Sequence, residues 1–242
     1  MVSFTYVDPE GSSHNIPGIR LGSLDGIDGS VGTVQTISNS DYTAVIKTRI
    51  SAAERVISLT IPVEAGSAAE LETNANTILS WFYQSETPGK LICNRDDNTS
   101  REVEVYVQQG YPTRSYESNT FCWIMIQLVA CSPYWTDTAE TAITHNTAFT
   151  NDGDYPAECR LTLNVTVKQI TLDGDVIMKF RDSSTMQSHY VTITDNAITA
   201  TDTSGNNALY KFTLSSKFDL IPTGTHTISG CKGTFRKRWG HA

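Results

Sequence analysis

The sequence has little of what marks a membrane, secreted or intrinsically disordered protein. No apolar run approaches the ~18 consecutive residues of a membrane helix, and the first ten residues lack the basic start and apolar stretch of a leader peptide. With 39% hydrophobic residues and charges of both signs, the composition also argues against disorder. We therefore expect a globular protein that folds in a cytoplasm and does not insert into a membrane.

Cysteine is scarce and widely spaced. The five cysteines are an odd number and include no Cys-x-x-Cys pair; they are Cys93, Cys122, Cys131, Cys159 and Cys231. Zinc sites usually show closely spaced cysteines, and disulfide frameworks usually contain an even number of them. The sequence predicts five reduced and mostly buried thiols.

Basic residues are rare before the C-terminal tail. The first 230 residues carry 14 basic and 26 acidic groups, and the last eleven supply Lys232, Arg236, Lys237 and Arg238, which leaves a net charge of −8. Binding to duplex nucleic acid needs several lysines and arginines facing phosphates. We therefore expect no specific nucleic-acid binding, and we interpret the tail as a solvated or interface-pairing end.

The familiar motifs of catalysis are missing. There is no nucleophile elbow, phosphate-binding loop or dinucleotide fingerprint. The five histidines are far apart and show no metal-binding spacing; they are His14, His145, His189, His226 and His241. No catalytic, cofactor-binding or metal-ligating residue is assigned, no cofactor is expected, and we predict that the protein is not an enzyme.

A few carboxylates could suggest chemistry by their spacing. The segments 151–154 (Asn-Asp-Gly-Asp) and 173–175 (Asp-Gly-Asp) place carboxylates two residues apart, but neither continues into a calcium loop with a distal Glu. Turn formation explains both. Asp96 and Asp97 lie in a polar turn, and Glu102 and Glu104 alternate with valines, which predicts one solvated face of a strand.

The most informative segment that is present is 121–135, Phe-Cys-Trp-Ile-Met-Ile-Gln-Leu-Val-Ala-Cys-Ser-Pro-Tyr-Trp. It predicts a long buried strand that ends at Ser132-Pro133, because proline cannot donate to a sheet ladder. The character of the chain changes here, and 20 of the 107 residues beyond Trp135 are threonine. We expect two domains, at residues 1–135 and 136–242.

The first domain is predicted to hold one helix among strands. The helix covers about residues 67–84 and starts with a capping box formed by Ser67 and Glu70. Its apolar residues recur on one face, at Leu71, Ala75, Ile78, Leu79 and Phe82, so that face should pack on a sheet. Strands are predicted at 42–50, 56–63, 90–93 and 102–107.

The second domain is predicted to be entirely β, with short strands at roughly ten-residue spacing. Leu161, Leu163, Val165 and Val167 alternate with polar residues, and Asp173-Gly174 predicts a hairpin turn between strands 170–173 and 176–180. Further strands are expected at 190–194, 198–201 and 209–214. Short strands of this kind are expected to form a β-sandwich.

Several of these pieces together resemble the distal tail protein family of phages with long, non-contractile tails. They are the Gly-rich opening at 19–29, the capped helix near residue 70, the strand that ends in Ser132-Pro133-Tyr134-Trp135, the segment 151–157, the segment 220–228, and the closing Arg238-Trp239-Gly240. The resemblance spans most of the chain. The sequence departs from the family pattern at Gly240, where a second aromatic residue is usual, and at His226, where Asn is common.

The resemblance implies a ring-forming N-terminal β domain with one helix and a C-terminal galectin-like β-sandwich. It implies a structural virion protein at the tail tip of a siphovirus, assembled in the host cytoplasm. A homohexameric ring, alone or as two stacked rings, would join the tail tube protein to the tail-tip hub or baseplate, in many phages also to a receptor-binding protein, and would let DNA pass. The residues of the ring interface stay unassigned.

The resemblance also bears on the closing strand, which would return to the first domain. The acidic balance there, 8 basic against 15 acidic residues up to Trp135, would favour such a return of a basic segment.

Two other functions remain open from sequence. The aromatic residues of the second half could form a sugar-stacking platform, which would make the protein a carbohydrate-binding, lectin-like β-sandwich; they are Trp135, Tyr155, Phe180, Tyr190, Tyr210, Phe212, Phe218 and Trp239. Most of them lie within alternating strand patterns, which favours a place in the core. A hydrolase would need a carboxylate pair across a cleft, which the sequence does not display.

Overall fold

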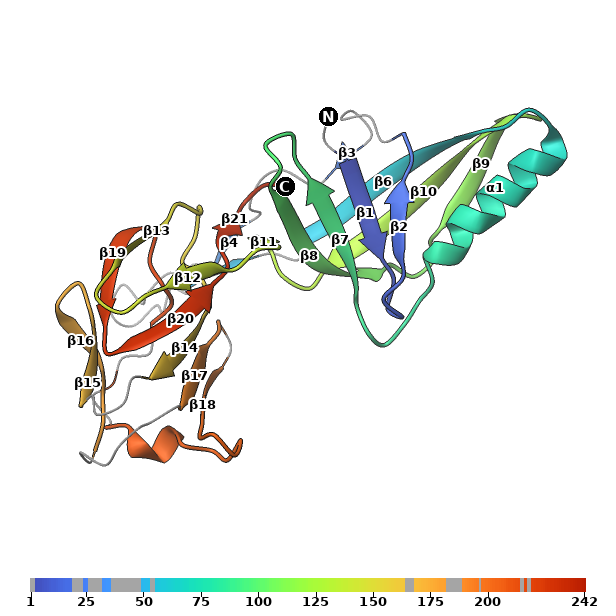
Figure 1. The fold of residues 1–242 in the computed structure, drawn as a ribbon. Helices are drawn as coiled ribbons and strands as arrows, with labels where there is room; N and C mark the ends of the chain where they lie inside the picture. The colour runs from blue at the N-terminus through green and yellow to red at the C-terminus, as the bar shows by residue number, and fades with distance from the viewer. Residues whose placement is uncertain are drawn as a thin grey trace, which may run out of the picture. The chain divides into compact units, whose positions relative to one another are not determined.

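The computed structural model describes residues 3–18, 24–25, 32–35, 49–52, 55–163, 168–181, 189–195, 197–213, 216 and 219–242 (Figure 1). The chain divides into two compact units. The first unit comprises Met1–Trp135 and Gly240–Ala242, and the second comprises Thr136–Trp239. Most of the strand predicted at 42–50 lies outside the described residues, as do Val165, Val167 and Phe218.

The first unit is built on an antiparallel sheet with the strand order β2-β1-β7-β8-β10-β6-β3, and β9 also pairs with β10. The strands are β1 (Ser3–Val7), β2 (Ser13–Ile16), β3 (Leu24–Asp25), β6 (Arg55–Glu64), β7 (Gly89–Asn94), β8 (Ser100–Val107), β9 (Thr113–Ser118) and β10 (Phe121–Ala130). A separate two-stranded sheet joins β4 (Gly32–Gln35) to β5 (Arg49–Ala52).

Strand β10 is the long buried strand that the sequence predicts, and it ends before Ser132-Pro133 as expected. It pairs with β6 along its whole length, from Phe121 opposite Glu64 to Ala130 opposite Arg55. Alternate residues of both strands point inward and are at most 8% exposed. Each fully buried aliphatic side chain contributes about 1.5–3 kcal/mol, so this strand pair forms the centre of the first core.

Helix α1 (Ala68–Trp81) packs its buried face, with Leu71, Ala75 and Ile78, toward β6 and β10. Ser67 Oγ accepts from the amide of Glu70 at 3.3 Å, which confirms the predicted cap. The Glu70 carboxylate accepts from the amide of Gly66 rather than of Ser67, at 2.9 Å, so the second bond of the box is displaced by one residue.

The helix is shorter than predicted and ends three residues before position 84. Phe82 leaves the helical conformation, with φ −106° and ψ 90°, and its amide bonds the carbonyl of Leu79 at 3.3 Å. The Phe82 ring is buried and stacks on Tyr6, with 4.5 Å between ring centroids. This stacking places Phe82 in the core through an extended backbone, which ends the helix at Trp81.

The second unit contains a five-stranded antiparallel sheet and a four-stranded one. The first has the order β12-β20-β14-β17-β18 and the second β13-β19-β15-β16. Their bounds are β12 (Thr141–Ile143), β13 (Ala148–Asn151), β14 (Cys159–Leu163), β15 (Gln169–Leu172), β16 (Asp175–Lys179), β17 (Tyr190–Ile193), β18 (Ile198–Thr201), β19 (Gly224–Ser229) and β20 (Cys231–Phe235). Strand β11 (Trp135–Asp137) pairs with β21 (Arg238–Trp239).

Both sheets of the second unit contribute to one core, as in a β-sandwich. Leu161 and Val191 come from the larger sheet, and Ile170 and Ile228 come from the smaller one; all four are fully buried. The predicted hairpin is present, because Asp173 and Gly174 both adopt positive φ, 52° and 92°, between β15 and β16. The predicted fold class, mainly β with one helix in the first part and a β-sandwich in the second, is confirmed.

The strand predicted at 209–214 is wrong. Leu209–Lys211 instead forms a turn of 3-10 helix. The side chain of Asn207 accepts from the amide of Leu209 at 2.9 Å, which starts a turn. Tyr210 is 67% exposed, so the apolar residues here do not alternate between core and solvent. Among residues 209–213, which the structure describes, only Phe212 keeps a strand-like contact, an isolated bridge to Phe180.

The cysteines agree with the predicted free thiols. All five are free, four are buried, and Cys131 is exposed. Burial raises the pKa of Cys159 and of Cys231 to about 12, so neither ionises near neutral pH. Within the described ranges, no helix is both long and apolar enough to cross a membrane.

Candidate functional site

The residues that could carry catalysis or bind a metal do not come together. Two of the histidines pair with aspartates in different units: His14 Nε2 lies 2.9 Å from Asp8, and His226 Nδ1 lies 2.7 Å from Asp173. Nδ1 of His145 accepts from the amide of Gly230 at 3.0 Å. In the part of the chain that the structure describes, no three His, Cys, Asp or Glu side chains are placed to hold a metal ion.

The carboxylate pairs serve turns and strand faces. Asn151 is fully buried and its amide donates to the carbonyls of Ile221 and Pro222 at 3.1 and 3.0 Å. Asp152 forms an ion pair with Lys237 at 2.6 Å. Asp173 accepts from the amide of Thr227 at 2.8 Å, and its hydrogen bond to His226 lowers its pKa. These contacts hold loops together, as the turn interpretation predicts.

Glu102 and Glu104 alternate with buried valines on β8, as predicted. Glu104 is exposed, and Glu102 lies on the same side, 3.3 Å from Lys90 of the neighbouring strand. Asp96 and Asp97 are exposed in the turn between β7 and β8. The described geometry therefore offers no acid–base pair in a cleft, and the surfaces of the two units become the candidates for function.

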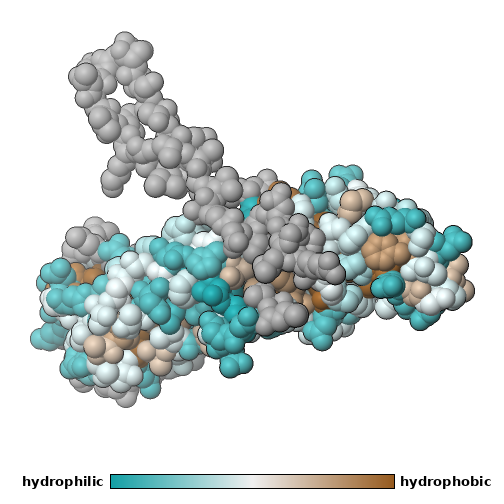
Figure 2. Space-filling model, turned by 90° about the horizontal axis from the view of Figure 1, so that it is seen from above, coloured by the Kyte–Doolittle hydropathy of each residue, from teal (hydrophilic) through white to brown (hydrophobic). Residues whose placement is uncertain are grey.

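The first unit carries an apolar surface on the side of the sheet opposite α1. The cross-strand register places Trp123 beside Pro62, and Val129 between Val56 and Tyr106. Val56, Tyr106 and Met125 are 39–40% exposed. We call this surface the apolar face, after Val56, Pro62, Tyr106, Trp123, Met125 and Val129. Three polar residues, Ser58, Thr60 and Gln127, lie on the same side of β6 and β10. Figure 2 shows hydrophobic surface among hydrophilic surface on the part of the protein that carries α1 and β9.

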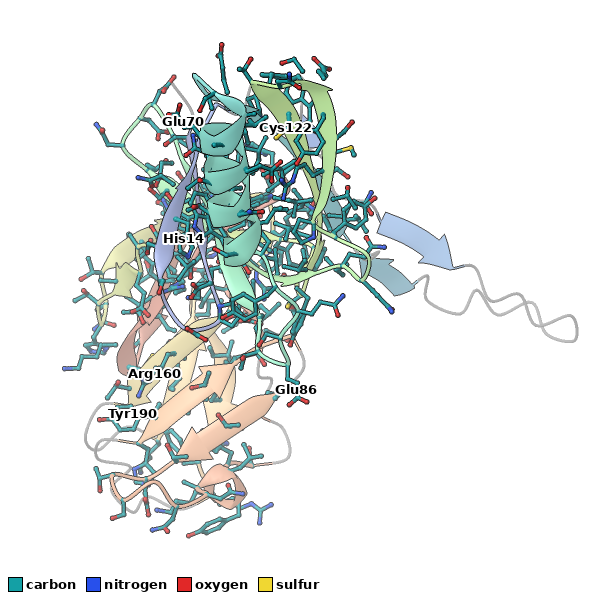
Figure 3. All side chains as sticks on the ribbon, turned by 90° about the vertical axis from the view of Figure 1, so that its right-hand side faces the viewer. His14, Glu70, Glu86, Cys122, Arg160 and Tyr190 are labelled. Atoms are coloured by element: carbon teal, nitrogen blue, oxygen red, sulfur yellow. The ribbon has the colours of Figure 1, made fainter. Side chains whose placement is uncertain are left out.

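The second unit has a polar surface on the outer side of its five-stranded sheet. Residues that alternate with the buried ones of β20, β14 and β17 form two rows, with Thr234, Arg160 and Thr192 in one and Lys232, Thr162 and Tyr190 in the other. We call these six residues the hydroxyl face. The Arg160 guanidinium lies over the Tyr190 ring, 5.2 Å from its centroid (Figure 3).

Three arginines of the first unit hold the end of the chain. The carbonyls of Gly240, His241 and Ala242 accept from Arg55, Arg101 and Arg95 at 2.8, 2.9 and 2.8 Å. Arg55 and Arg101 are only 3% and 5% exposed. We call this arrangement the arginine clamp.

Two basic residues of the tail, Lys237 and Arg238, are instead paired with acids of the second unit. Arg238 pairs with Glu158 and Asp195 at 2.7 and 2.9 Å, and Lys237 pairs with Asp152. The tail end is therefore held in the first unit through backbone carbonyls and not through the attraction of basic side chains to an acidic domain.

Sequence reasoning missed both the arginine clamp and the hydroxyl face. The alternation around Leu161 and Leu163 did indicate that Arg160 and Thr162 point outward. The neighbours of β14 were not readable, because β17 and β20 lie far along the chain. The family resemblance indicates a return of the closing strand to the first domain, but it does not identify the three arginines, because their partners are backbone carbonyls more than 135 residues away.

The fold matches a known phage protein over almost the whole chain. No protein-family model and no curated protein matches the sequence. Among solved structures, the Dit protein of phage SPP1, described as a paradigm of the hub adsorption apparatus in phages that infect Gram-positive bacteria, aligns with a TM-score of 0.67. The alignment covers 98% of this chain and 99% of that one, at 11% sequence identity.

A chain of the phage P2 baseplate, in its activated conformation with calcium, aligns over the full length of both chains with a TM-score of 0.50 and 9% identity. The resemblance to phage distal tail proteins that the sequence indicates is thus confirmed at the level of the fold, and this chain has the fold of the SPP1 Dit protein.

Proposed function

We propose that this chain is a structural protein of a phage tail tip, a distal tail adaptor that forms a homohexameric ring. The observation that carries the proposal is the alignment of both units, in one chain and in the same order, with the SPP1 Dit protein over 98% of the length. Random likeness between common β folds rarely extends over two successive units. The second unit would then be the galectin-like domain of this family.

The ring would connect the tail tube protein to the tail-tip hub, with a receptor-binding protein as a further partner. Such a role requires surfaces that bind other protein chains, and it does not require catalytic side chains. The apolar face of the first unit supplies one: exposed apolar patches on a sheet are costly in water and mark contact sites. We assign the contact between copies to this face, with Met125 near its centre.

The ring would also let DNA pass. The chain carries a net charge of −8, and Asp96 and Asp97 are exposed at the tip of the β7–β8 turn. Acidic side chains that line a channel repel the phosphates of DNA and prevent adhesion. Replacement of Asp96 and Asp97 by lysine in the phage should slow DNA ejection, and unchanged ejection kinetics would contradict a lumenal position for this turn.

The experiment that tests the adaptor function is the solution mass of the purified protein, by light scattering, with negative-stain images of the same sample. We expect a sixfold ring with the mass of six chains of 26.6 kDa, or of twelve if two rings stack. A monomer that stays monomeric when the tail tube and hub proteins of the same phage are added would refute the proposal.

A further inference from the structure

We propose that the hydroxyl face of the second unit is a binding site for acidic saccharides, sugars that carry a carboxylate or phosphate group. This inference does not depend on the hexameric ring. It rests on the side chains of three neighbouring strands, β20, β14 and β17, and on the depression that they line together with β12.

The first observation is the pair of cations. Arg160 and Lys232 occupy diagonal positions on adjacent strands, because Arg160 lies opposite Thr234 and Lys232 lies opposite Thr162. Diagonal neighbours in an antiparallel sheet are about 7–8 Å apart. Neither side chain makes an ion pair within the described part of the chain. Two such cations at this spacing can contact one anionic group from both sides.

The second observation is that Arg160 is held in place. Its guanidinium lies 5.2 Å from the centroid of the Tyr190 ring. A guanidinium stacked on an aromatic face keeps its edge donors free for two parallel hydrogen bonds to a carboxylate or phosphate. Stacking reduces the side-chain entropy that binding would otherwise cost, so Arg160 is prepared for a planar or tetrahedral anion.

The third observation is the threonine hydroxyls around the cations. Thr144, Thr162 and Thr234 line the same depression as Arg160 and Lys232, with a volume of about 440 Å³. This lies within the roughly 300–1,000 Å³ of small-molecule sites. Each hydroxyl donates one hydrogen bond and accepts two, which matches the hydroxyl groups of a sugar.

The acidic residues of this sheet lie beyond the two rows. Glu140 and Glu158 line a neighbouring depression that Arg160, Thr192 and Thr234 also border. Two further cations, Arg236 and Arg238, line this depression, and Glu158 pairs with Arg238 at 2.7 Å. An anion at Arg160 therefore meets two cations and several hydroxyls. One anionic group among hydroxyls describes an acidic sugar better than an acidic peptide, which has carboxylates but few hydroxyls, or a nucleic acid, which needs a row of cations and open rings for stacking.

The test is a binding titration by calorimetry at low salt with four probes: an alginate oligosaccharide, phosphorylated dextran, unmodified dextran and poly-glutamate. We expect at least one of the two acidic saccharides to bind at least tenfold more tightly than unmodified dextran and poly-glutamate. Binding of alginate alone identifies a carboxylate site, binding of phosphorylated dextran alone a phosphate site, and binding of both a general acidic-sugar site. Equal or tighter binding of poly-glutamate would instead assign the face to acidic protein segments.

The variant is Arg160→Gln with Lys232→Gln, and the matched control is Lys168→Gln with Lys179→Gln, two exposed lysines on or beside the other sheet of the same unit. We expect about a tenfold or greater loss for the first, because a hydrogen bond to a charged group contributes about 1.5–3 kcal/mol, and no change for the second. Circular dichroism verifies that both fold. Equal losses in the two variants, or no acidic saccharide binding by the unmodified protein, would overturn the proposal.

Discussion

The two units present opposite kinds of outer sheet surface, although both are antiparallel β structures with a buried inner side. The outward residues of β6 and β10 in the first unit include Val56, Trp123 and Met125, whereas those of β14 and β20 in the second are Arg160, Thr162, Lys232 and Thr234. An apolar surface favours contacts that stay dry and permanent, and a polar, charged one favours contacts that are wet and reversible. Under the two proposals above, the first unit would form the contact between copies, and the second would bind a ligand reversibly.

The largest effect should come from disrupting the proposed contact between copies at the apolar face. Met125→Glu places a charge in the centre of the apolar face, and burial of an unpaired charge in a contact costs several kcal/mol. We expect the proposed ring to be lost and a monomer to appear by light scattering, with the fold intact by circular dichroism. The matched control is Ile198→Glu, because Ile198 is an equally exposed apolar strand residue of the second unit, 37% against 40%. Loss of the ring in both variants would argue against the apolar face.

The next comparison concerns the two cores. Leu128→Ala in the first unit and Leu161→Ala in the second each remove a fully buried side chain, which should cost about 2–5 kcal/mol. If the units unfold separately, each substitution lowers the stability of its own unit and leaves the other transition unchanged in differential scanning calorimetry. A single transition that both substitutions shift equally would show that the units unfold together.

Loss of the arginine clamp should lower the stability of the first unit only. Removal of Gly240–Ala242 takes away three carbonyl partners and leaves Arg55 and Arg101 buried with fewer hydrogen bonds. Because a hydrogen bond to a charged group contributes about 1.5–3 kcal/mol, we expect a loss of at least about 1.5 kcal/mol in the unfolding free energy of the first unit. Chemical denaturation followed by fluorescence would measure it, and an unchanged midpoint would contradict the clamp.

The smallest effect should be a difference in acid sensitivity. Asp8 accepts from His14 and from the amides of Glu10 and Ser12, and these bonds lower its pKa. A lowered folded-state pKa stabilises the protein above about pH 4, and this stabilisation is lost as pH falls through the folded pKa. In the Asp8→Asn variant, the melting temperature of the first unit should therefore decrease less steeply as the pH is lowered below 4.

Asp173 provides the comparison in the second unit, because it also pairs with a histidine and has a lowered pKa. The Asp173 side chain is 49% exposed, whereas that of Asp8 is 9% exposed. Solvent weakens interactions of the more exposed group, so Asp173→Asn should change the acid profile less. An equal or larger change would reverse this ranking.

The sequence is sufficient for elements that neighbouring residues determine. The β10 strand follows from its apolar run and from Pro133, α1 from Ser67 and its apolar period, and the β15–β16 hairpin from Asp173-Gly174. The 3-10 turn at Leu209 was missed although its determinant is local, because the apolar residues at 209 and 212 were given more weight than the turn-forming side chain of Asn207. The two faces depend on which strands lie side by side, and this pairing links residues as distant as Arg160 and Thr234, for which a single sequence holds no local signal.

The arginine clamp makes the second unit an insertion within the first, since the chain leaves the first unit after Trp135 and re-enters it at Gly240. A ribosome therefore produces all of the second unit before the last residues of the first. The first unit therefore cannot acquire residues 240–242 before the whole second unit has been translated, so the order of synthesis places completion of the first core after that of the second.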